Sequence, residues 1–485
     1  MTPRKTHTSK KIGSSSPHTP NPVSGYSAHD RRTGASPKQR ISARQRKQQG
    51  LRPSAVDKAQ AADLNAQVGS FTVGSDHVVI TRRQLLYGAA GVAALGAAGF
   101  TYSQYSHKKA EESKVNALTV AKDAVLSSND LEQAKASAYV TREASFHLPY
   151  GTLLWCNDDS VAACLLPGED ANPLTQIALL WLSSGNYPVV LEKAVGQAEG
   201  FNVFDVRATS EGVIWVECNV LAGTWRVYTA TLSGDGSLGQ PALADEGDAD
   251  WDTPSITLVG NLAFWQVLPS ASGEKSKEDS LLKKVAVGTE ESSVVLSSHG
   301  RMATAPYPYV DSVICTPRAD ATSVHYQLTR VNASTDQVMD TMILPQSMRP
   351  LEAGYGATGF TFAFDAIYNY GEGIANLGTY APQTSPSSGD YGSVDWFRWE
   401  RNPSCAPMWC GNLLVVKSTT AVCGVDLAAR KYFALTVENG AASYGDMLAT
   451  SGMHDSFVMY SNVNSRPING KAKKYCNVRV YKIHS

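Results

Sequence analysis

Residues 204–243 carry the pattern that decides the fold, FDVRATSEGVIWVECNVLAGTWRVYTATLSGDGSLGQPAL. Short runs rich in β-branched and aromatic residues alternate there with turn residues at 210–212, 222–223 and 233–236. Runs of this kind, bounded by Gly, Asn, Asp or Ser, are typical of strands joined by tight turns. The segment therefore predicts a four-stranded antiparallel meander.

Similar strand pairs recur along the chain after residue 139. They start roughly 40 to 55 residues apart, at residues 153, 204, 255, 309, 360, 407 and 447. This spacing is close to the roughly 40 to 50 residues of a β-propeller blade. Residues 139–485 hold seven such units of about 48 residues, which predicts an all-β propeller with seven blades of four antiparallel strands.

The last unit, which ends YCNVRVYKIH at residues 475–484, is one strand short. Residues 139–148 are predicted to supply this strand and to close the ring, so that the propeller has no free edge. Two β-sandwich domains stay open as the alternative fold, because the polar stretch 270–279 could link them.

The meander and its spacing resemble the irregular seven-bladed propellers of the TolB/WD40-like class over roughly 345 residues. The likeness lies in this pattern alone. The chain has no Gly-His and Trp-Asp pair in each blade, no kelch double Gly and no Ser-x-Asp-x-Gly-x-Thr-Trp box. The resemblance therefore implies a fold and no particular ligand.

The charge of the chain changes sign along its length. The first 80 residues hold thirteen Lys and Arg against four Asp, whereas 28 Lys and Arg stand against 40 Asp and Glu after Phe100. Residues 1–77 have few aromatic or β-branched residues, which predicts a disordered basic tail. Basic residues before an apolar run favour retention on the cytoplasmic side. No nucleic acid partner is expected, because no aromatic platform for base stacking accompanies the charge.

Residues 78–102 form a weakly apolar segment, and residues 88–100 contain only Gly, Ala, Val, Leu and Phe. The segment resembles the twin-arginine export signal of bacteria through Thr81, Arg82, Arg83, Leu85 and Leu86. The resemblance implies that the twin-arginine export machinery recognises the paired Arg residues and carries a folded passenger.

Residues 85–100 are 16 residues long, just under the roughly 17 to 25 that cross a bilayer, and the run reaches 18 residues with Thr101 and Tyr102. No clean Ala-x-Ala cleavage site is found. We therefore expect an apolar anchor helix in the cytoplasmic membrane, with the C-terminal domain outside. A cleaved signal and a secreted protein stay open. Residues 103–138 are predicted to form a helical spacer, because apolar residues such as Leu118 and Leu131 recur there at mixed helical spacing.

No pattern of catalytic or metal-binding residues is found. Most of the eight cysteines lie in apolar runs, which favours buried thiols, and Cys405 and Cys410 are the best candidates for a disulfide. Asp248, Asp250 and Asp252 alternate as in a calcium loop but lack the Gly and the distal Glu of an EF-hand, so a solvated loop is expected. No cofactor, metal site or catalytic residue is therefore predicted.

The function predicted from the sequence is a non-enzymatic scaffold of the cell envelope that binds an unknown protein, peptide or glycan. Aromatic and arginine residues near the expected strand starts are candidate binding anchors. The candidates are Trp251, Tyr307, Tyr309, Tyr355, Trp396, Arg398, Trp399, Arg401 and Trp409.

Two other interpretations stay open. The alternation of aromatic and charged residues at 395–401 can simply mark a strand with one buried face. The chain can also be a propeller hydrolase or lyase that acts on an envelope polymer, with its carboxylates spread over different blades.

Overall fold

The structure is a computed structural model, and it describes residues 67–73, 76–81, 115–168, 174–272, 274–364, 373–374, 377–400, 405–465 and 473–484. The chain divides into two units, Met1–Ala66 and Gln67–Ser485. All described residues belong to the second unit.

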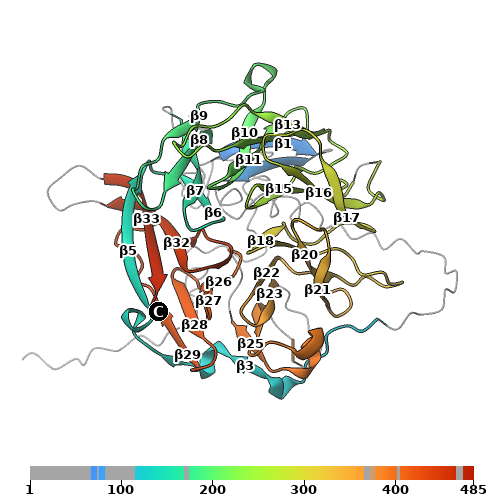
Figure 1. The fold of residues 1–485 in the computed structure, drawn as a ribbon, viewed down its shortest axis with the longest axis vertical. Helices are drawn as coiled ribbons and strands as arrows, with labels where there is room; N and C mark the ends of the chain where they lie inside the picture. The colour runs from blue at the N-terminus through green and yellow to red at the C-terminus, as the bar shows by residue number, and fades with distance from the viewer. Residues whose placement is uncertain are drawn as a thin grey trace, which may run out of the picture. The chain divides into compact units, whose positions relative to one another are not determined.

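Seven sheets of four or more strands follow one another along the chain, and Figure 1 shows them arranged as blades around a centre. The first sheet contains β6 (Leu153–Cys156), β7 (Val161–Pro167), β8 (Leu174–Trp181) and β9 (Val189–Leu191), and the second contains β10 (Asn202–Thr209), β11 (Gly212–Asn219), β12 (Thr224–Thr231) and β13 (Ala242–Gly247). The third sheet contains β14 (Ile256–Val259), β15 (Leu262–Val267), β16 (Ser280–Ala286) and β17 (Ser293–Ser298). The fourth contains β18 (Tyr307–Tyr309), β19 (Ser312–Cys315), β20 (Gln327–Asn332) and β21 (Val338–Ile343).

The other three sheets include strands from distant parts of the chain. The fifth sheet contains β22 (Glu352–Gly356), β23 (Gly359–Phe364), β24 (Gly378–Pro382), β25 (Trp396–Trp399) and β3 (Val125–Ser127). The sixth contains β31 (Gly452–His454), β26 (Met408–Cys410), β27 (Leu413–Lys417), β28 (Val422–Asp426), β29 (Lys431–Ala434) and β4 (Glu132–Gln133). The seventh contains β30 (Met447–Leu448), β32 (Ser456–Ser465), β33 (Lys473–Ile483) and β5 (Val140–Leu148). The prediction of an all-β propeller is confirmed, and the alternative of two β-sandwiches is wrong.

The segment 204–243 forms the second sheet, in the order β10-β11-β12-β13. Strand β11 is buried from Gly212 to Cys218 without the alternation of a half-exposed strand. Successive side chains of a strand point to opposite faces, so a strand buried at every position has both faces covered. Trp215 is fully buried and stacks on Tyr228, with ring centroids 5.5 Å apart. Packing between neighbouring blades therefore forms much of the core.

The ring closes between the two ends of the propeller. β5 pairs antiparallel with β33, from Val140 opposite Ile483 to Leu148 opposite Cys476. Leu148 is buried there in a cluster that includes Leu154 of the first blade. The prediction that residues 139–148 complete the last blade is therefore confirmed.

Residues 115–138 do not form the helix expected of a spacer, so that prediction is wrong for the described part of 103–138. They form β3, β4 and three short 3-10 helices, η2 (Lys122–Ala124), η3 (Ser128–Asp130) and η4 (Ala136–Ala138). β3 pairs in parallel with β25, and β4 pairs in parallel with β29. The segment thus covers the outer edges of two blades, which protects their unpaired backbone groups.

The predicted tail 1–77 and signal 78–102 lie mostly outside the described residues. The described part is a hairpin of β1 (Gln67–Val73) and β2 (Asp76–Thr81). Thr81 ends β2, whereas Arg82, Arg83, Leu85 and Leu86 lie outside the described residues. No helix among the described residues is long and apolar enough to cross a membrane.

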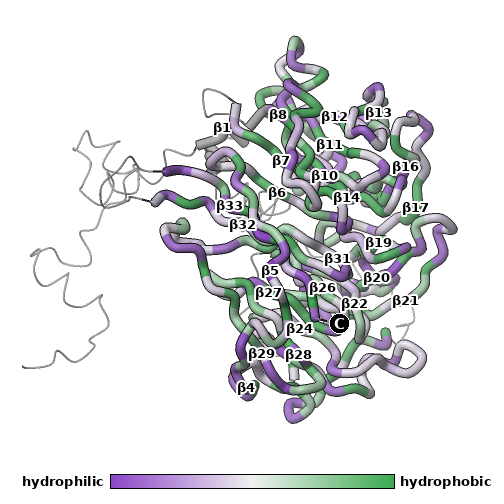
Figure 2. Tube along the Cα trace, turned by 60° about the vertical axis from the view of Figure 1, so that its left-hand side comes forward, coloured by the Kyte–Doolittle hydropathy of each residue, from purple (hydrophilic) through white to green (hydrophobic). Residues whose placement is uncertain are grey.

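Figure 2 shows hydrophobic segments along the strands and hydrophilic ones in many loops. All eight cysteines are described and all are free thiols, seven of them buried. The prediction of buried thiols is confirmed, and the predicted bridge between Cys405 and Cys410 is wrong. The remaining 3-10 helices are η5 (Gln197–Glu199), η6 (Ser387–Gly389) and η7 (Tyr391–Ser393).

Candidate functional site

Polar and aromatic side chains from the innermost strands of four blades face one another. Trp155 comes from β6, Arg207 from β10, Tyr307 from β18 and Glu352 from β22. Strands of non-adjacent blades approach each other only near the axis of a propeller, so these side chains lie at its central channel. We call Arg207, Tyr307 and Glu352 the channel cluster.

Arg207 is held in place by its own strand and by a neighbouring blade. Its guanidinium forms an ion pair with Asp205 and donates to the carbonyl of Val206 at 2.7 Å. It also lies over the ring of Trp155, 4.7 Å from the ring centre. The Arg207 side chain keeps 15% of its surface exposed, so the fixed positive charge can still meet a ligand.

Tyr307 and Glu352 form the other half of the cluster. The Tyr307 hydroxyl donates a hydrogen bond to the Glu352 carboxylate. Burial raises the pKa of Glu352 to about 7, and the hydrogen bond from Tyr307 opposes this rise. Burial and the neighbouring carboxylate raise the pKa of Tyr307 well above its usual range, while the charge of Arg207 opposes that rise. Arg207 is near enough to Tyr307 to act on it electrostatically, so we treat the two halves as one candidate site.

Further titratable groups lie beside this cluster. Cys405 acts electrostatically on both Tyr307 and Lys417, and burial raises the pKa of its thiol to about 11. The Lys417 ammonium donates to the carbonyls of Tyr444, at 2.8 Å, and Asp446, at 2.6 Å. Burial lowers the pKa of Lys417. These groups extend the polar lining toward the blades that contain β27 and β30.

The structure brings only one predicted binding residue, Tyr307, into the channel cluster. Tyr309 and Tyr355 pack edge to face, with ring centres 4.8 Å apart, and Arg330 covers both rings. Trp251 lies away from them in a separate pocket of about 300 Å³, where Lys275 covers its ring.

In the described part of the segment 395–401, the aromatic side chains are buried. Trp396 and Trp399 of β25 are buried, as is Trp409 of β26, so these predicted anchors belong to the core. Arg398 forms an ion pair with Glu400. Arg401 lies outside the described residues.

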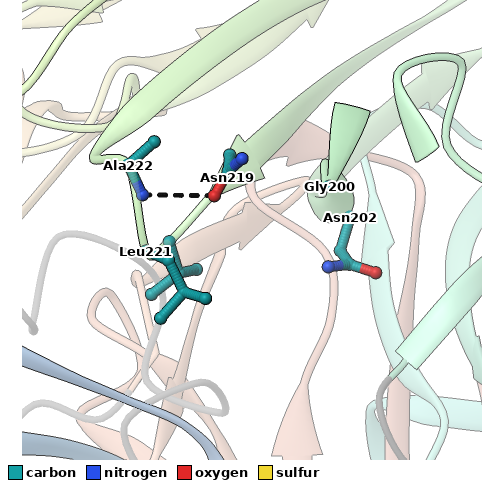
Figure 3. Close-up of a pocket in the computed structure, with 6 residues that line it drawn as sticks. Gly200, Asn202, Asn219, Leu221 and Ala222 are labelled. Carbon is teal, nitrogen blue, oxygen red and sulfur yellow. Dashed lines mark hydrogen bonds between the residues drawn. The ribbon is translucent and has the colours of Figure 1, made fainter. Parts of the chain in front are cut away.

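Two surface features do not offer catalytic groups. A pocket of about 480 Å³ beside the turn after β11 carries no charged side chain, and Leu221 in it is 91% exposed (Figure 3). Asp248 accepts a hydrogen bond from the backbone of Asp250, and Asp252 pairs with Arg301. Across the described ranges, no three His, Cys, Asp or Glu side chains gather as a metal site would need.

No family model matches the chain, and the comparison with curated proteins finds no relative. Among solved structures, a prolyl endopeptidase is 10% identical over 72% of this chain and 48% of its own length, with a TM-score of 0.45. An oligogalacturonate lyase in complex with manganese is 13% identical over 73% of this chain and 96% of its own, with a TM-score of 0.38. A second such lyase, from Vibrio parahaemolyticus, is 13% identical over 70% and 97%, with a TM-score of 0.39. The chain spans about half of the peptidase and nearly all of each lyase, and these likenesses show the fold alone.

The prediction of a non-enzymatic binding scaffold is wrong. The similar solved structures are described as peptidases, a puromycin hydrolase and lyases, and none of these descriptions is that of a non-catalytic scaffold. The channel cluster brings one carboxylate, one hydroxyl and one basic group together from different blades, which is part of the convergence of carboxylates and a basic residue that the alternative of a hydrolase or lyase predicts.

Proposed function

We propose that this chain is a lyase that cleaves uronate-containing glycans of the cell envelope at the channel cluster. The observation that carries the proposal is the hydrogen-bonded pair of Tyr307 and Glu352 under the positive charge of Arg207. An arginine can bind and neutralise the carboxylate of a uronate. The acidity of the carbon next to that carboxylate then rises, which makes removal of its proton feasible.

Elimination suits this site better than hydrolysis. Most glycoside hydrolases need two carboxyl groups free to act as acid and as base or nucleophile. Asp205 is buried and already bound to Arg207 and to the N–H of Val206, which leaves Glu352 as the available carboxylate. Cys405 is a poor nucleophile, because a pKa of about 11 keeps its thiol protonated at neutral pH.

The reaction follows from the placement of three groups. The Glu352 carboxylate takes the proton from C5 of the uronate, next to the carboxylate that Arg207 binds. The electron pair of that C–H bond forms a C4–C5 double bond while the C4–O bond breaks, and the Tyr307 hydroxyl protonates the departing oxygen. Glu352 then returns its proton to Tyr307 through their hydrogen bond, so that no water is consumed. A base with a pKa of about 7 is well matched to this transfer.

The test is formation of an unsaturated uronate, which absorbs ultraviolet light that the substrate does not, from polygalacturonate and alginate as probes. We expect Glu352→Gln to reduce the rate by a factor of roughly 10² to 10⁴, because it removes the base. Glu246→Gln is the matched control, since Glu246 is exposed and pairs with Arg226 on another part of the propeller. An equal loss in both variants would contradict the assignment, as would full activity in Glu352→Gln.

We also propose that residues 81–86 direct export by the twin-arginine machinery and that residues 85–102 contact the membrane. The support is the Thr-Arg-Arg-x-Leu-Leu pattern before a Gly- and Ala-rich run, and the change of charge across it. The enzyme would then meet glycans outside the cytoplasm, either anchored or released. Replacing Arg82 and Arg83 by Lys should retain the protein in the cytoplasm, and unchanged cell fractionation of this variant would contradict export by this route.

A further inference from the structure

One short strand of the last blade leaves its own sheet and crosses the channel. β31 pairs in parallel with β26, so that Gly452 lies opposite Met408 and His454 opposite Cys410. Just before it, Thr450 forms a parallel bridge with Cys156 of the first blade, and Ser451 donates to the Cys156 carbonyl at 3.3 Å. Figure 2 labels β31 close to β22 and β26, and β31 contacts both of these strands.

The same strand reaches the blades on the far side of the axis. β31 contacts both β18 and β22. A Cβ atom on Gly452 would lie only 2.6 Å from the carbonyl oxygen of Pro308. Gly452 also has φ +90°, a conformation that favours glycine. The segment 450–454 therefore touches four blades, and we call it the plug.

Side chains fix the far end of the plug. The Nε2–H of His454 donates a 2.9 Å hydrogen bond to the Ser451 carbonyl, and its other ring nitrogen lies 3.5 Å from Asp159 of the first blade. Ser456 donates to the same carboxylate at 2.6 Å. These contacts join the plug to the turn after β6.

The channel cluster lies directly on one side of the plug. Tyr307 is the residue before Pro308, which meets Gly452, and Glu352 is the first residue of β22. The plug runs parallel to β26 and therefore advances toward the end of this inner strand, not toward its start. On the open side, Arg207 is the sixth residue of β10, about 16 Å from its exposed first residue at roughly 3.3 Å per residue.

We infer that the plug makes the channel a blind site, so that the enzyme takes the end of a glycan chain and not its middle. This inference rests on the proposed lyase function. A chain that threaded the channel would need a second opening, and the backbone of the segment 450–454 occupies that path. A channel with one mouth admits a chain terminus, which predicts removal of short units from chain ends.

Product size decides between cleavage at ends and cleavage within chains. With polygalacturonate or alginate as the substrate, we expect short unsaturated oligomers from the earliest time points, while the remaining polymer keeps its length. Gly452→Ala should displace the plug and shift early products at least several-fold toward longer chains. Gly440→Ala is the matched control, because Gly440 also has positive φ, +82°, but lies outside the plug. Long products from the wild-type protein at early times would overturn the inference, whether or not Gly452→Ala folds.

A binding measurement separates this inference from the lyase proposal. Uronate tetramers with free ends are compared with tetramers that carry bulky groups at both ends, using Glu352→Gln and calorimetric titration. If no unsaturated product forms, the lyase proposal fails, yet tighter binding of free-ended tetramers still supports a blind site. Equal binding of both probes overturns the blind site, and absence of both product and binding overturns both proposals.

Discussion

Glu352→Gln should change how the stability of the protein depends on pH. Burial raises the pKa of Glu352 from 4.5 to about 7, which corresponds to about 3 kcal/mol of unfavourable free energy for the buried, ionised carboxylate. Below pH 4.5 the group is protonated in both the folded and the unfolded protein. Between pH 4.5 and about 7 the folded protein holds a proton that the unfolded chain has released, so stability falls as the pH rises. Above about pH 7 the Glu352 carboxylate is ionised in both states, and the folded protein is destabilised by the full amount.

Glu352→Gln removes the unfavourable free energy of the buried, ionised carboxylate and keeps a side chain of similar shape. Urea unfolding followed by Trp fluorescence, at pH values from 4 to 9, gives the free energy of unfolding of both proteins. We expect the wild-type protein to lose about 3 kcal/mol relative to Glu352→Gln between pH 4 and pH 8. Other titrating groups are shared and cancel in the difference. A difference that stays constant with pH, or one that moves in favour of the wild-type protein as pH rises, would refute the raised pKa.

Two further predictions test the cluster and the ring. Tyr307→Phe removes the hydrogen bond that lowers the pKa of Glu352, so the rise of kcat/KM with pH should move to higher pH, and kcat should fall roughly 10²-fold; an unshifted pH profile would argue against the pair. Leu148→Ala should lower the free energy of unfolding by about 2 to 5 kcal/mol in urea unfolding, because Leu148 is 2% exposed where β5 closes the ring. Leu221→Ala, at a residue 91% exposed, is the control and should stay within about 0.5 kcal/mol of the wild-type protein.

The architecture was predictable because it rests on local patterns. The turns at 210–212 and 222–223 fall between β10, β11 and β12, so the meander could be found from turn residues and β-branched runs alone. The closing strand followed from counting, since the last unit lacked a partner that residues 139–148 could supply. Both inferences need only the sequence near each strand and the rule that propellers have no free edge.

The channel cluster could not be predicted from the sequence, because its residues are far apart in the chain and form no sequence motif. Arg207 and Glu352 lie in different blades and meet only when the ring closes. One signal was present, since Asp205 and Arg207 place two charges on one face of an otherwise apolar strand. Charged side chains in a strand that is otherwise buried must pair with each other or with another polar group. This requirement indicates a polar site inside the fold at Asp205 and Arg207.

For the aromatic residues, the sequence predicted exposed binding anchors where the structure has buried side chains. Trp396 and Trp399 alternate with charged neighbours, which looked like an exposed face, yet both are buried. The reason is that β3 covers the outer edge of β25, so this outermost strand is not a free edge. The same covering segment was mistaken for a helix, because Leu118 and Leu131 bury against separate blades at a spacing that also suits a helical face.

The way in which the ring closes bears on the proposed export route. β5 belongs to the start of the propeller and pairs with β33, the last strand, so the final blade cannot form until the chain is synthesised to Ile483. Pairing between such distant segments is slow, and an unclosed blade exposes a strand edge meanwhile. A route that carries folded passengers would let this pairing finish in the cytoplasm. The order of assembly therefore supports the proposal that the twin-arginine pattern acts as an export signal.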